Sequence, residues 1–382
     1  VMKIVRVEAS HQAYPFQGYF KFLGPEGHQV VTVSITADDG TVGWGQSVFP
    51  LRWSYETPET ALVLIARYYG PAILGHHPLE LGAIHEILDR TLPPGFTQGF
   101  PLIRAGLDIA LHDLAGKILR QPIWRLWGRG TPSPVQLSWT VNVTSLTEAE
   151  KVVEEGWKKG YRNFNLKVAP DLRFDLELVR IVRKMAPECF LWADANGGYD
   201  LETAKQAVKK FADAGLNVLE APLRPNQIAG YRELRRLRAV PIIMDEGVIT
   251  AHDLLEFIRL EMIDGLAVKL SRCGGLFPAR RQMEIVLDAG LLALGSGLTD
   301  PDVSLAASLA LFGAYGLRFP AALNGPQFLA ESVLSQPIRI EGDQAICPEG
   351  PGLGVEVDCT QLDKLTVPPR DPLKTSKVCV GL

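Results

Sequence analysis

The sequence predicts a protein of the α/β class, in which a modified (β/α)8 (TIM) barrel follows a smaller N-terminal α+β domain. Three observations support this prediction. The predicted secondary structure changes near residue 128, from β-rich and then helical segments to a regular alternation of strands and helices. The alternation repeats short apolar strands and amphipathic helices at intervals of roughly 25 residues, as successive βα units do. A carboxylate ends each of three consecutive strands. The total of 382 residues suits two domains.

The first domain is expected over residues 1–128. Residues 28–36 are rich in β-branched side chains and predict a strand, Asp38-Asp39-Gly40 predicts a turn, and residues 42–46 predict the next strand. From residue 57 the pattern becomes helical, and residues 103–114 carry an apolar stripe at helical spacing. A sheet followed by helices makes an α+β domain.

The barrel is expected over residues 129–330, after a Gly- and Pro-containing linker. The predicted strands are 137–143, 163–168, 190–194, 218–220, 241–245, 265–270, 291–296 and 321–323. A doubly wound open sheet is the alternative, but no Gly-rich phosphate loop follows any of these strands. Residues 331–382 are expected to leave the barrel and pack back on the first domain.

Composition excludes several classes of protein. The net charge of −4, from 39 basic and 43 acidic residues, argues against a general nucleic-acid surface. No apolar run reaches the roughly 18 residues needed to cross a bilayer, and the N-terminal residues read as a strand instead of a signal peptide. Five scattered cysteines without metal-type spacing fit reduced thiols in the cytoplasm. We therefore expect no membrane or nucleic-acid partner.

Three carboxylates stand at the ends of the third, fourth and fifth predicted barrel strands: Asp194, Glu220 and Asp245. Because the carboxyl ends of barrel strands meet at one mouth, we expect these side chains to lie together. A single acidic residue there often caps the following helix. Three in series repel one another unless a hard cation binds, and oxygen ligands favour Mg²⁺, with Mn²⁺ as an alternative.

Two lysines lie on either side of this series. Lys167 ends the second predicted strand and Lys269 the sixth, so the two face each other across a barrel of eight strands. A lysine acts as a general base only if its pKa falls well below about 10.4. Burial, a nearby divalent cation and a second ammonium group all favour such a change. Either lysine alone could simply extend to solvent, but two opposed lysines beside three carboxylates indicate proton abstraction next to a metal-bound carboxylate.

The sequence resembles the enolase superfamily, specifically its muconate lactonizing enzyme-like branch. The resemblance covers nearly the whole chain and rests on residues 105–117 and 122–128, the carboxylate series, Lys269 with Cys273-Gly274-Gly275, and Pro351-Gly352-Leu353-Gly354. It implies a capping domain over a modified barrel, one Mg²⁺ held by Asp194, Glu220 and Asp245, and acid/base work by Lys167 and Lys269. It also implies supporting roles for Asn165, Asn196 and Glu246, and a homo-oligomer.

Two departures from relatives refine this expectation. Many members of the branch have a second lysine where this chain has Asn165, so Lys269 is the stronger candidate for the base. The mandelate racemase-like branch would place a histidine base at the seventh strand. Residues 291–297 contain no histidine, and His252 is expected on a helix, so that branch is disfavoured.

The resemblance implies a small carboxylic acid as substrate, with the rest of the substrate selected by loops of the capping domain and by the eighth strand. Two aromatic-rich loops, 14–20 and 51–55, are expected to close over it through Tyr19, Phe20 and Trp53, although ordinary interdomain packing is the alternative. Ser296 and Asn324 are further candidate contacts. Ser296 is no expected nucleophile, because the Gly-x-Ser-x-Gly elbow is absent. Residues 323–327 offer amides and no carboxylate, which disfavours dipeptides, and few polar groups in the cap suit a sugar acid.

Several reactions share the expected enediolate intermediate. Racemisation or epimerisation of an N-substituted amino acid or similar acid is favoured, because opposed lysines serve both faces of the α-carbon. Cycloisomerisation and acid dehydration are alternatives at the same site. A non-catalytic binding relative would show a broken triad or a missing lysine, and the sequence shows neither. Metal-dependent aldolases and decarboxylases give no reason for two opposed lysines.

Overall fold

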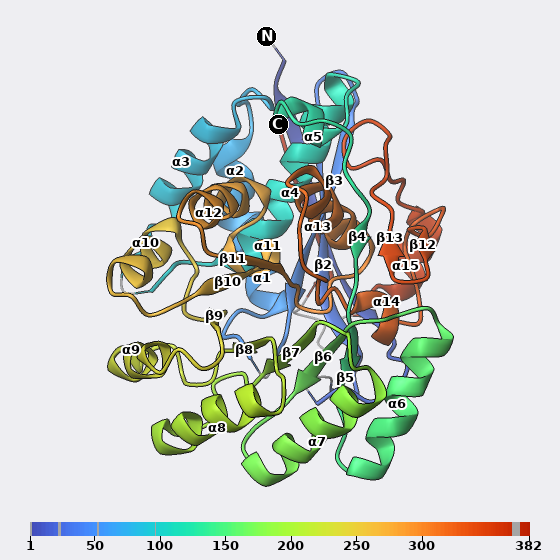
Figure 1. The fold of residues 1–382 in the computed structure, drawn as a ribbon. Coiled ribbons are helices and arrows are strands. Elements are labelled where there is room, and N and C mark those ends of the chain that lie inside the picture. Colours follow the sequence, from blue (N-terminus) through green and yellow to red (C-terminus); the bar gives the residue numbers. More distant parts are fainter. Residues whose placement is uncertain (1, 22–23, 52, 96, 369–374) are drawn as a thin grey trace.

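The structure is a computed structural model that describes residues 2–21, 24–51, 53–95, 97–368 and 375–382. Figure 1 shows an N-terminal sheet with its helices, a larger α/β region below and beside it, and a C-terminal segment that runs back to the N-terminal sheet. No helix in these described ranges is long and apolar enough to span a membrane. All five cysteines are free thiols.

The N-terminal sheet is antiparallel, with strand order β14-β1-β2-β3. Its strands are β1 (Ile4–Tyr14), β2 (His28–Ala37), β3 (Val42–Phe49) and β14 (Lys377–Gly381). The helices of this region are α1 (Pro58–Leu64), the π-helical turn η1 (Ile65–Tyr69), α2 (Gly70–Ile73), α3 (Leu81–Thr91), α4 (Pro101–Ile118) and α5 (Ile123–Leu126). The long helix α4 packs directly on β3. This close approach requires glycine at positions 43 and 45, because a Cβ at Gly43 or Gly45 would collide with the backbone of α4.

The larger region contains a curled parallel sheet of seven strands in the order β11-β10-β9-β8-β7-β6-β5. The strands are β5 (Trp139–Val141), β6 (Phe164–Lys167), β7 (Leu191–Asp194), β8 (Val218–Glu220), β9 (Ile242–Met244), β10 (Gly265–Val268) and β11 (Leu292–Gly295). The helices between and after them are α6 (Leu146–Lys158), α7 (Leu172–Met185), α8 (Leu201–Asp213), α9 (Ile228–Arg236), α10 (Ala251–Arg259), α11 (Leu270–Cys273), α12 (Leu276–Asp288) and α13 (Asp302–Ala314). The predicted alternation of strands and helices is confirmed for these seven units.

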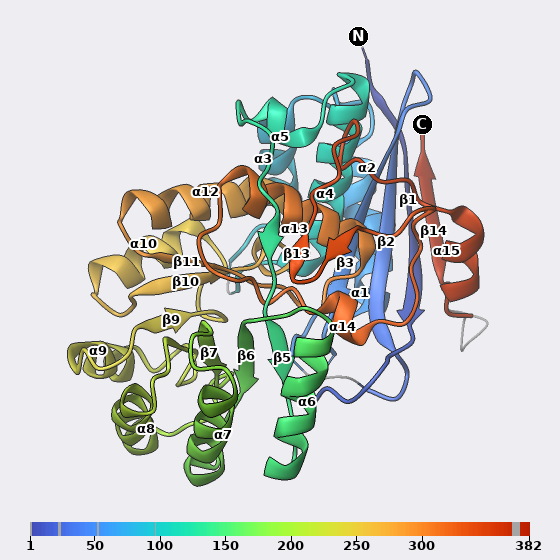
Figure 2. The same ribbon diagram turned by 45° about the vertical axis from the view of Figure 1, so that its right-hand side comes forward.

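The eighth predicted strand, residues 321–323, does not form a regular ladder. It makes two isolated parallel bridges, from Ala322 to Ser296 and from Ala321 to Leu137. The chain just before β5 is also diverted, since β4 (Val135–Gln136) pairs antiparallel with β13 (Gln344–Ala345) in a separate small sheet completed by β12 (Ile340–Glu341). Figure 2 shows β4 beside β13. The same stretch also reaches the eighth segment, because the backbone N–H of Ala321 donates to the carbonyl oxygen of Gln136 at 2.7 Å. The closed eight-stranded ring stays a prediction.

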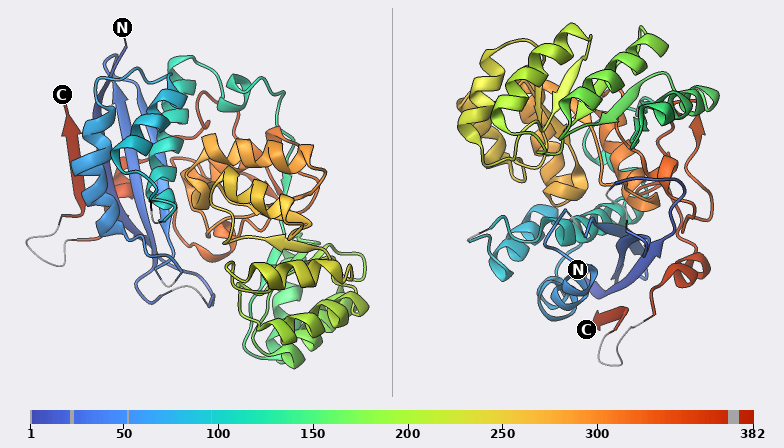
Figure 3. Two further views of the ribbon diagram at one scale, coloured as in Figure 1. Left: turned by 90° about the vertical axis from the view of Figure 1, so that its left-hand side faces the viewer. Right: turned by 90° about the horizontal axis from the view of Figure 1, so that it is seen from below.

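The C-terminal segment continues through α14 (Gly325–Phe328) and α15 (Cys359–Leu365) and ends in β14. This last strand pairs antiparallel with β1, with Val380 opposite Val7. Both chain ends therefore lie at one side of the molecule (Figure 3). The exact boundaries at residues 128 and 330 stay a prediction.

Asp108 on α4 connects the N-terminal helices to the parallel-sheet region. This buried carboxylate accepts a hydrogen bond from the His85 ring at 2.6 Å and from the backbone N–H of Phe277 at 3.3 Å, besides that of Leu276. Leu276 and Phe277 are the first residues of α12, where free N–H groups favour a negative charge. These hydrogen bonds hold the N-terminal region against the region that contains the parallel sheet.

Candidate active site

Adjacent strand ends bring the predicted chemistry together. Lys167 on β6 is in register with Asp194 on β7, which is in register with Glu220 on β8. Asp245 directly follows β9, and Lys269 directly follows β10. Because parallel strands end at the same edge, these five side chains meet at one side of the curled sheet.

The three carboxylates form a compact cluster. One oxygen from each of Asp194, Glu220 and Asp245 can be chosen so that all three lie within 4.8 Å of one another, and each residue is 1% exposed. Oε1 of Glu220 is buried and has no hydrogen-bond partner among the described residues. Oxygen donors at this density, one of them without a hydrogen bond, fit a hard divalent cation better than they fit one another.

Crowding raises the pKa of two acidic groups in the cluster. Burial, and then the charges of Asp194 and Asp245, raise the pKa of Glu220 well above its usual value. Burial and the charges of Asp245 and Asp194 likewise raise the pKa of Glu246 to about 7. For Asp245, burial alone would raise the pKa, but Lys269 and Arg272 outweigh it and bring the value to about 2. Asp245 therefore holds its negative charge more readily than Glu220 and Glu246 do.

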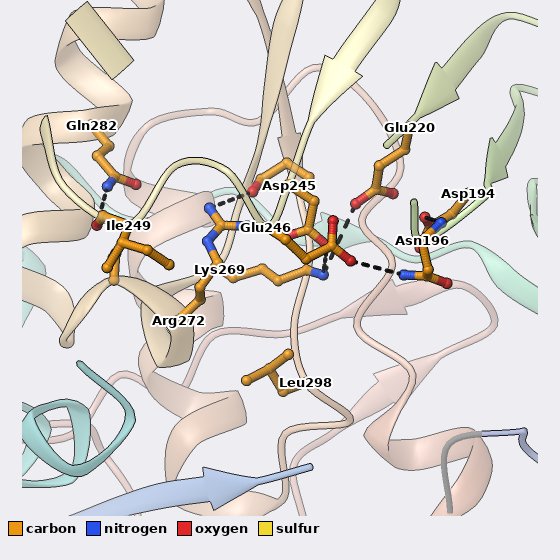
Figure 4. Close-up of polar contacts among 12 residues, drawn as sticks. Asp194, Asn196, Glu220, Asp245, Glu246, Ile249, Lys269, Arg272, Gln282 and Leu298 are labelled. Carbon is orange, nitrogen blue, oxygen red and sulfur yellow. Dashed lines mark hydrogen bonds and ion pairs between the residues drawn. The ribbon is translucent and has the colours of Figure 1, made fainter. Parts of the chain in front are cut away.

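Lys269 lies among these carboxylates, as Figure 4 shows. Its Nζ donates to Asp245 and lies 3.9 Å from Oε1 of Glu220, and the residue is 6% exposed. Burial alone would lower its pKa, but the charges of Asp245, Glu220, Glu246 and Asp194 together raise it. A general base needs a lowered pKa, whereas the carboxylates by themselves raise the pKa of Lys269.

Lys167 occupies the other flank of the cluster. Its Nζ donates to Oδ2 of Asp194 at 2.5 Å and lies 5.8 Å from the centre of the Phe20 ring. Asn165, two residues earlier on the same strand, is 1% exposed and lines the same cavity as Lys167. Each lysine is therefore paired with a carboxylate at a different end of the cluster.

A cavity opens over these groups. Its described lining includes both lysines, Asp194 and Glu220, with the further residues Phe20, His28, Pro50, Trp53, Asn165, Asn196, Ser296, Gly297, Leu298, Thr299, Ala322 and Asn324. A second cavity, which Asp245, Glu246 and Tyr55 help to line, shares Pro50, Trp53, Lys269 and Leu298 with the first. The space that a substrate could fill thus lies between the N-terminal loops and the strand ends.

The predicted loop residues divide into two groups. Phe20 is 6% exposed and stacks on Phe328 at 4.7 Å, and Trp53 borders both cavities. Tyr19 is 59% exposed and is not among the described residues that line either cavity. Arg52, in the second predicted loop, lies outside the described residues.

The supporting residues predicted from the sequence lie beside the cluster. Asn196 donates from Nδ2 to Oε1 of Glu246 at 3.2 Å, and its backbone N–H donates to Oδ1 of Asp194 at 2.9 Å. Asn196 has φ of 46°, in the left-handed region that asparagine tolerates better than most residues. The turn after β7 therefore positions a carboxylate of the cluster and reaches Glu246 at the same time.

Two residues of the site were not predicted from the sequence. Arg272 donates to Asp245 through one guanidinium nitrogen and to the Ala267 carbonyl oxygen through the other, at 3.0 Å. The sequence could have indicated Arg272 through its spacing from Lys269. Residues three apart lie on the same side of a helix, so Arg272 could be expected to face the same site as Lys269. His28 enters from the first strand pair of the other domain, which no local spacing relates to the barrel.

Comparison with known proteins agrees with this geometry. Residues 2–128 match the family described as mandelate racemase / muconate lactonizing enzyme, N-terminal domain, and residues 146–361 match the family described as enolase C-terminal domain-like. The chain is 30% identical over 368 residues to muconate cycloisomerase 1 of Rhodococcus opacus, covering 94% of this chain and 96% of that protein. It is 25% identical over 342 residues to the N-succinyl-L-Arg/Lys racemase of Bacillus cereus, covering 88% and 90%.

Solved structures show the same fold. The crystal structure of 2-chloromuconate cycloisomerase from Rhodococcus opacus 1CP has a TM-score of 0.87 and 26% identity, and covers 96% of this chain and 100% of that one. The N-succinyl Arg/Lys racemase from Bacillus cereus has a TM-score of 0.89 at 22% identity, covering 99% and 100%, and shows the likeness of fold alone. The chain belongs to the muconate lactonizing enzyme-like branch of the enolase superfamily.

Proposed function

We propose that this protein is an isomerase that removes the proton α to a substrate carboxylate, using Mg²⁺ held by Asp194, Glu220 and Asp245. The observation that carries the proposal is that a buried three-carboxylate cluster has a lysine at each flank, with Lys167 on Asp194 and Lys269 on Asp245. When bound, a divalent cation would supply positive charge for the carboxylate and for the enediolate that proton removal leaves. Mn²⁺ fits the same donor set.

The protein side chains then have separate tasks. Lys269 takes or returns the α-proton at one face of the substrate carbon, and Lys167 does so at the other. A cation bound to the carboxylates would also offset the negative charges that raise the pKa of Lys269. Asn196 and Glu246 hold the ligand arrangement through their hydrogen bond. Phe20 and Trp53 exclude water from the cavity.

We favour a 1,1-proton transfer, racemisation or epimerisation of an N-substituted amino acid or similar acid. Lysines at both flanks suit proton removal from one face and return to the other. The relatives support more than one outcome, because one is named a racemase and several are named muconate or chloromuconate cycloisomerases. Cycloisomerisation is therefore the second candidate, and acid dehydration is a third use of the same intermediate.

The test is α-proton exchange in D2O. The protein with Mg²⁺ is incubated with a library of carboxylic acids, and wild type, Lys167→Ala and Lys269→Ala are compared by mass spectrometry. Deuterium at the α-carbon of one acid, lost in a lysine variant, supports α-proton abstraction, and loss of racemisation in both variants supports the two-lysine mechanism. Loss in Lys269→Ala alone assigns the base to Lys269 and leaves Lys167 as acid or electrostatic support. Racemisation that survives in both variants would refute the two-lysine mechanism.

Three further expectations belong to this proposal. Residues 321–323 would close the curled sheet as the eighth unit of a modified barrel, supported by their bridges to Ser296 and Leu137. The protein would act as a homo-oligomer in the cytoplasm. Its small-molecule partner would be a carboxylate substrate.

A further inference from the structure

Asp300 is a buried carboxylate that lies behind the wall of the active-site cavity. It is 2% exposed and directly follows the cavity-lining residues 296–299, but it is not itself among the described residues that line that cavity. Burial raises its pKa, and hydrogen bonds together with the charge of Lys269 offset this effect only in part. A buried carboxylate is costly unless its hydrogen bonds are well made, so the partners of Asp300 show what it holds in place.

One oxygen of Asp300 reaches the helical turn that follows Lys269. Ser271, which is 1% exposed, donates from Oγ to Oδ1 of Asp300. Ser271 is the second residue of α11, and Lys269 directly precedes this helix of four residues. A helix this short has little stability of its own, so contacts with its surroundings must hold it. The hydrogen bond between Ser271 and Asp300 is therefore one of the contacts that fix the backbone from which Lys269 extends.

The other oxygen of Asp300 holds the loop that lines the cavity. Oδ2 accepts the backbone N–H of Leu298 at 3.1 Å. Thr299, between these two residues, has φ of 61°, in the left-handed region that a β-branched residue rarely adopts. Such a conformation persists only where the surrounding structure enforces it. The hydrogen bond from Leu298 to Asp300 spans Thr299 and supplies such a constraint.

Two glycines leave room for Asp300. A Cβ at Gly297 would collide with Oδ2 of Asp300, and a Cβ at Gly325 would collide with its carbonyl oxygen. Gly297 belongs to the cavity wall and Gly325 begins α14, so two separate segments pack closely around this residue. Close packing of this kind restricts Asp300 to one arrangement. The carboxylate thus joins the loop after β11 to the helical turn that follows Lys269.

We propose that Asp300 is a positioning residue, which places Lys269 through Ser271 and holds the cavity wall through the backbone of Leu298. This inference rests on the proposed function, because it assigns Asp300 a task in proton transfer at the substrate face that Lys269 serves. Asp300 acts through these neighbours and does not face the substrate. A small displacement of a reacting group costs a large factor in rate, so loss of the link should slow that transfer.

The experiment compares α-proton exchange in D2O for the two enantiomers of one acid, with Mg²⁺ present. The enantiomer whose exchange is lost in Lys269→Ala is the one whose proton faces Lys269. For that enantiomer, Ser271→Ala and Asp300→Ala should each lower kcat about 10- to 100-fold and change KM less. Exchange of the opposite enantiomer, whose proton faces Lys167, should fall much less. Asp300→Asn keeps the size of the side chain and one acceptor oxygen, so it should recover part of the loss.

Two comparisons separate positioning from a general defect of the fold. A variant that is merely less well folded would slow both enantiomers alike. The double variant Ser271→Ala with Asp300→Ala should exchange no more slowly than Asp300→Ala alone, because both changes remove one link. Ser308→Ala is the matched control, because Ser308 is a buried serine on α13 whose Oγ has no hydrogen-bond partner within the described ranges.

Wild-type rates in Ser271→Ala and Asp300→Ala, equal losses for both enantiomers, or additive losses in the double variant would overturn the proposal. Failure of the proposed function would give a different result, since wild type would then exchange the α-proton of no acid. Denaturant unfolding would still test the link in that case. The unfolding midpoint of the double variant should lie no lower than that of Asp300→Ala, and additive shifts of the midpoint would show that Ser271 and Asp300 are not linked.

Discussion

Arg272 and Lys269 donate to the two oxygens of one carboxylate, Asp245, from either end of a single helical turn. Arg272 also holds the carbonyl oxygen of Ala267 on β10, so its guanidinium joins the strand that carries Lys269 to the loop that carries Asp245. An arginine fits this task because its planar fork can bind two acceptors at once. The position of Lys269 therefore depends on Arg272 as well as on its own strand.

Replacing Arg272 should weaken catalysis without removing a reacting group. Arg272→Met is expected to lower the α-proton exchange rate about 10- to 100-fold and to raise the Mg²⁺ concentration needed for half-maximal rate, as loss of an outer-shell partner usually does. Arg272→Lys should recover only part of the loss. The exposed Arg281→Met on α12 serves as control. Wild-type rate and Mg²⁺ dependence in Arg272→Met would refute this positioning role.

Metal binding should stabilise the protein through Glu220. With Mg²⁺ at about 100 times its Kd, the gain in unfolding free energy is about 2.7 kcal/mol, and a chelator should remove it together with exchange activity. Glu220→Gln removes a carboxyl group whose ionisation the buried cluster disfavours, so it should abolish the Mg²⁺-dependent gain while leaving the chelated protein at least as stable as wild type. Thermal unfolding with and without Mg²⁺ measures both effects. A full Mg²⁺ gain in the variant would exclude Glu220 as a ligand.

Trp53 should affect substrate binding more than chemistry. It is 41% exposed and borders both cavities, which fits a cover over bound substrate. Trp53→Ala should raise KM about tenfold or more with a smaller change in kcat, because it removes binding area shared by ground and transition states. Trp157→Ala, at a residue 44% exposed on α6, is the control. An unchanged KM for the true substrate would rule out the covering role.

Glu56 should make stability depend on pH. This carboxyl is 1% exposed and accepts the backbone N–H groups of Leu102 and Ile103, in the first turn of α4. Burial raises its pKa from 4.5 to about 7. The folded state thus binds more protons than the unfolded state between these values, and the contribution of Glu56 to stability falls as pH rises through that window.

The difference between wild type and Glu56→Gln isolates this contribution. Relative to the variant, wild type should lose about 3 kcal/mol of unfolding free energy as the pH rises from about 4 to about 8, with little further change above that window. Any loss from the altered contacts with α4 is independent of pH and cancels in the comparison. Denaturant unfolding at several pH values provides the measurement, with the exposed Glu86→Gln as control. A difference that is constant with pH would contradict a buried, protonatable Glu56.

The antiparallel strands 28–36 and 42–46, the helix over 103–114 and seven of the eight barrel strands could be predicted from local patterns alone. Alternation and helical periodicity are short-range properties, so they can be read without knowing what an element packs against. The eighth segment, residues 321–323, makes one isolated bridge on each side, to Ser296 and to Leu137, instead of a regular ladder. The extent of such pairing depends on how the neighbouring segments lie, which the residues of the segment itself do not encode.

The sequence by itself was enough to predict that three carboxylates would lie together at one edge of the parallel sheet. Asp194, Glu220 and Asp245 recur once per βα unit, and the topology of a parallel sheet then places them at one edge. Only the tertiary structure decided that Arg272 shares Asp245 with Lys269, that Phe20 and not Tyr19 borders the cavity, and that His28 reaches it from the other domain. The physical reason is that repeat spacing follows from local hydrogen bonding, whereas contacts between domains depend on how two separately formed surfaces pack.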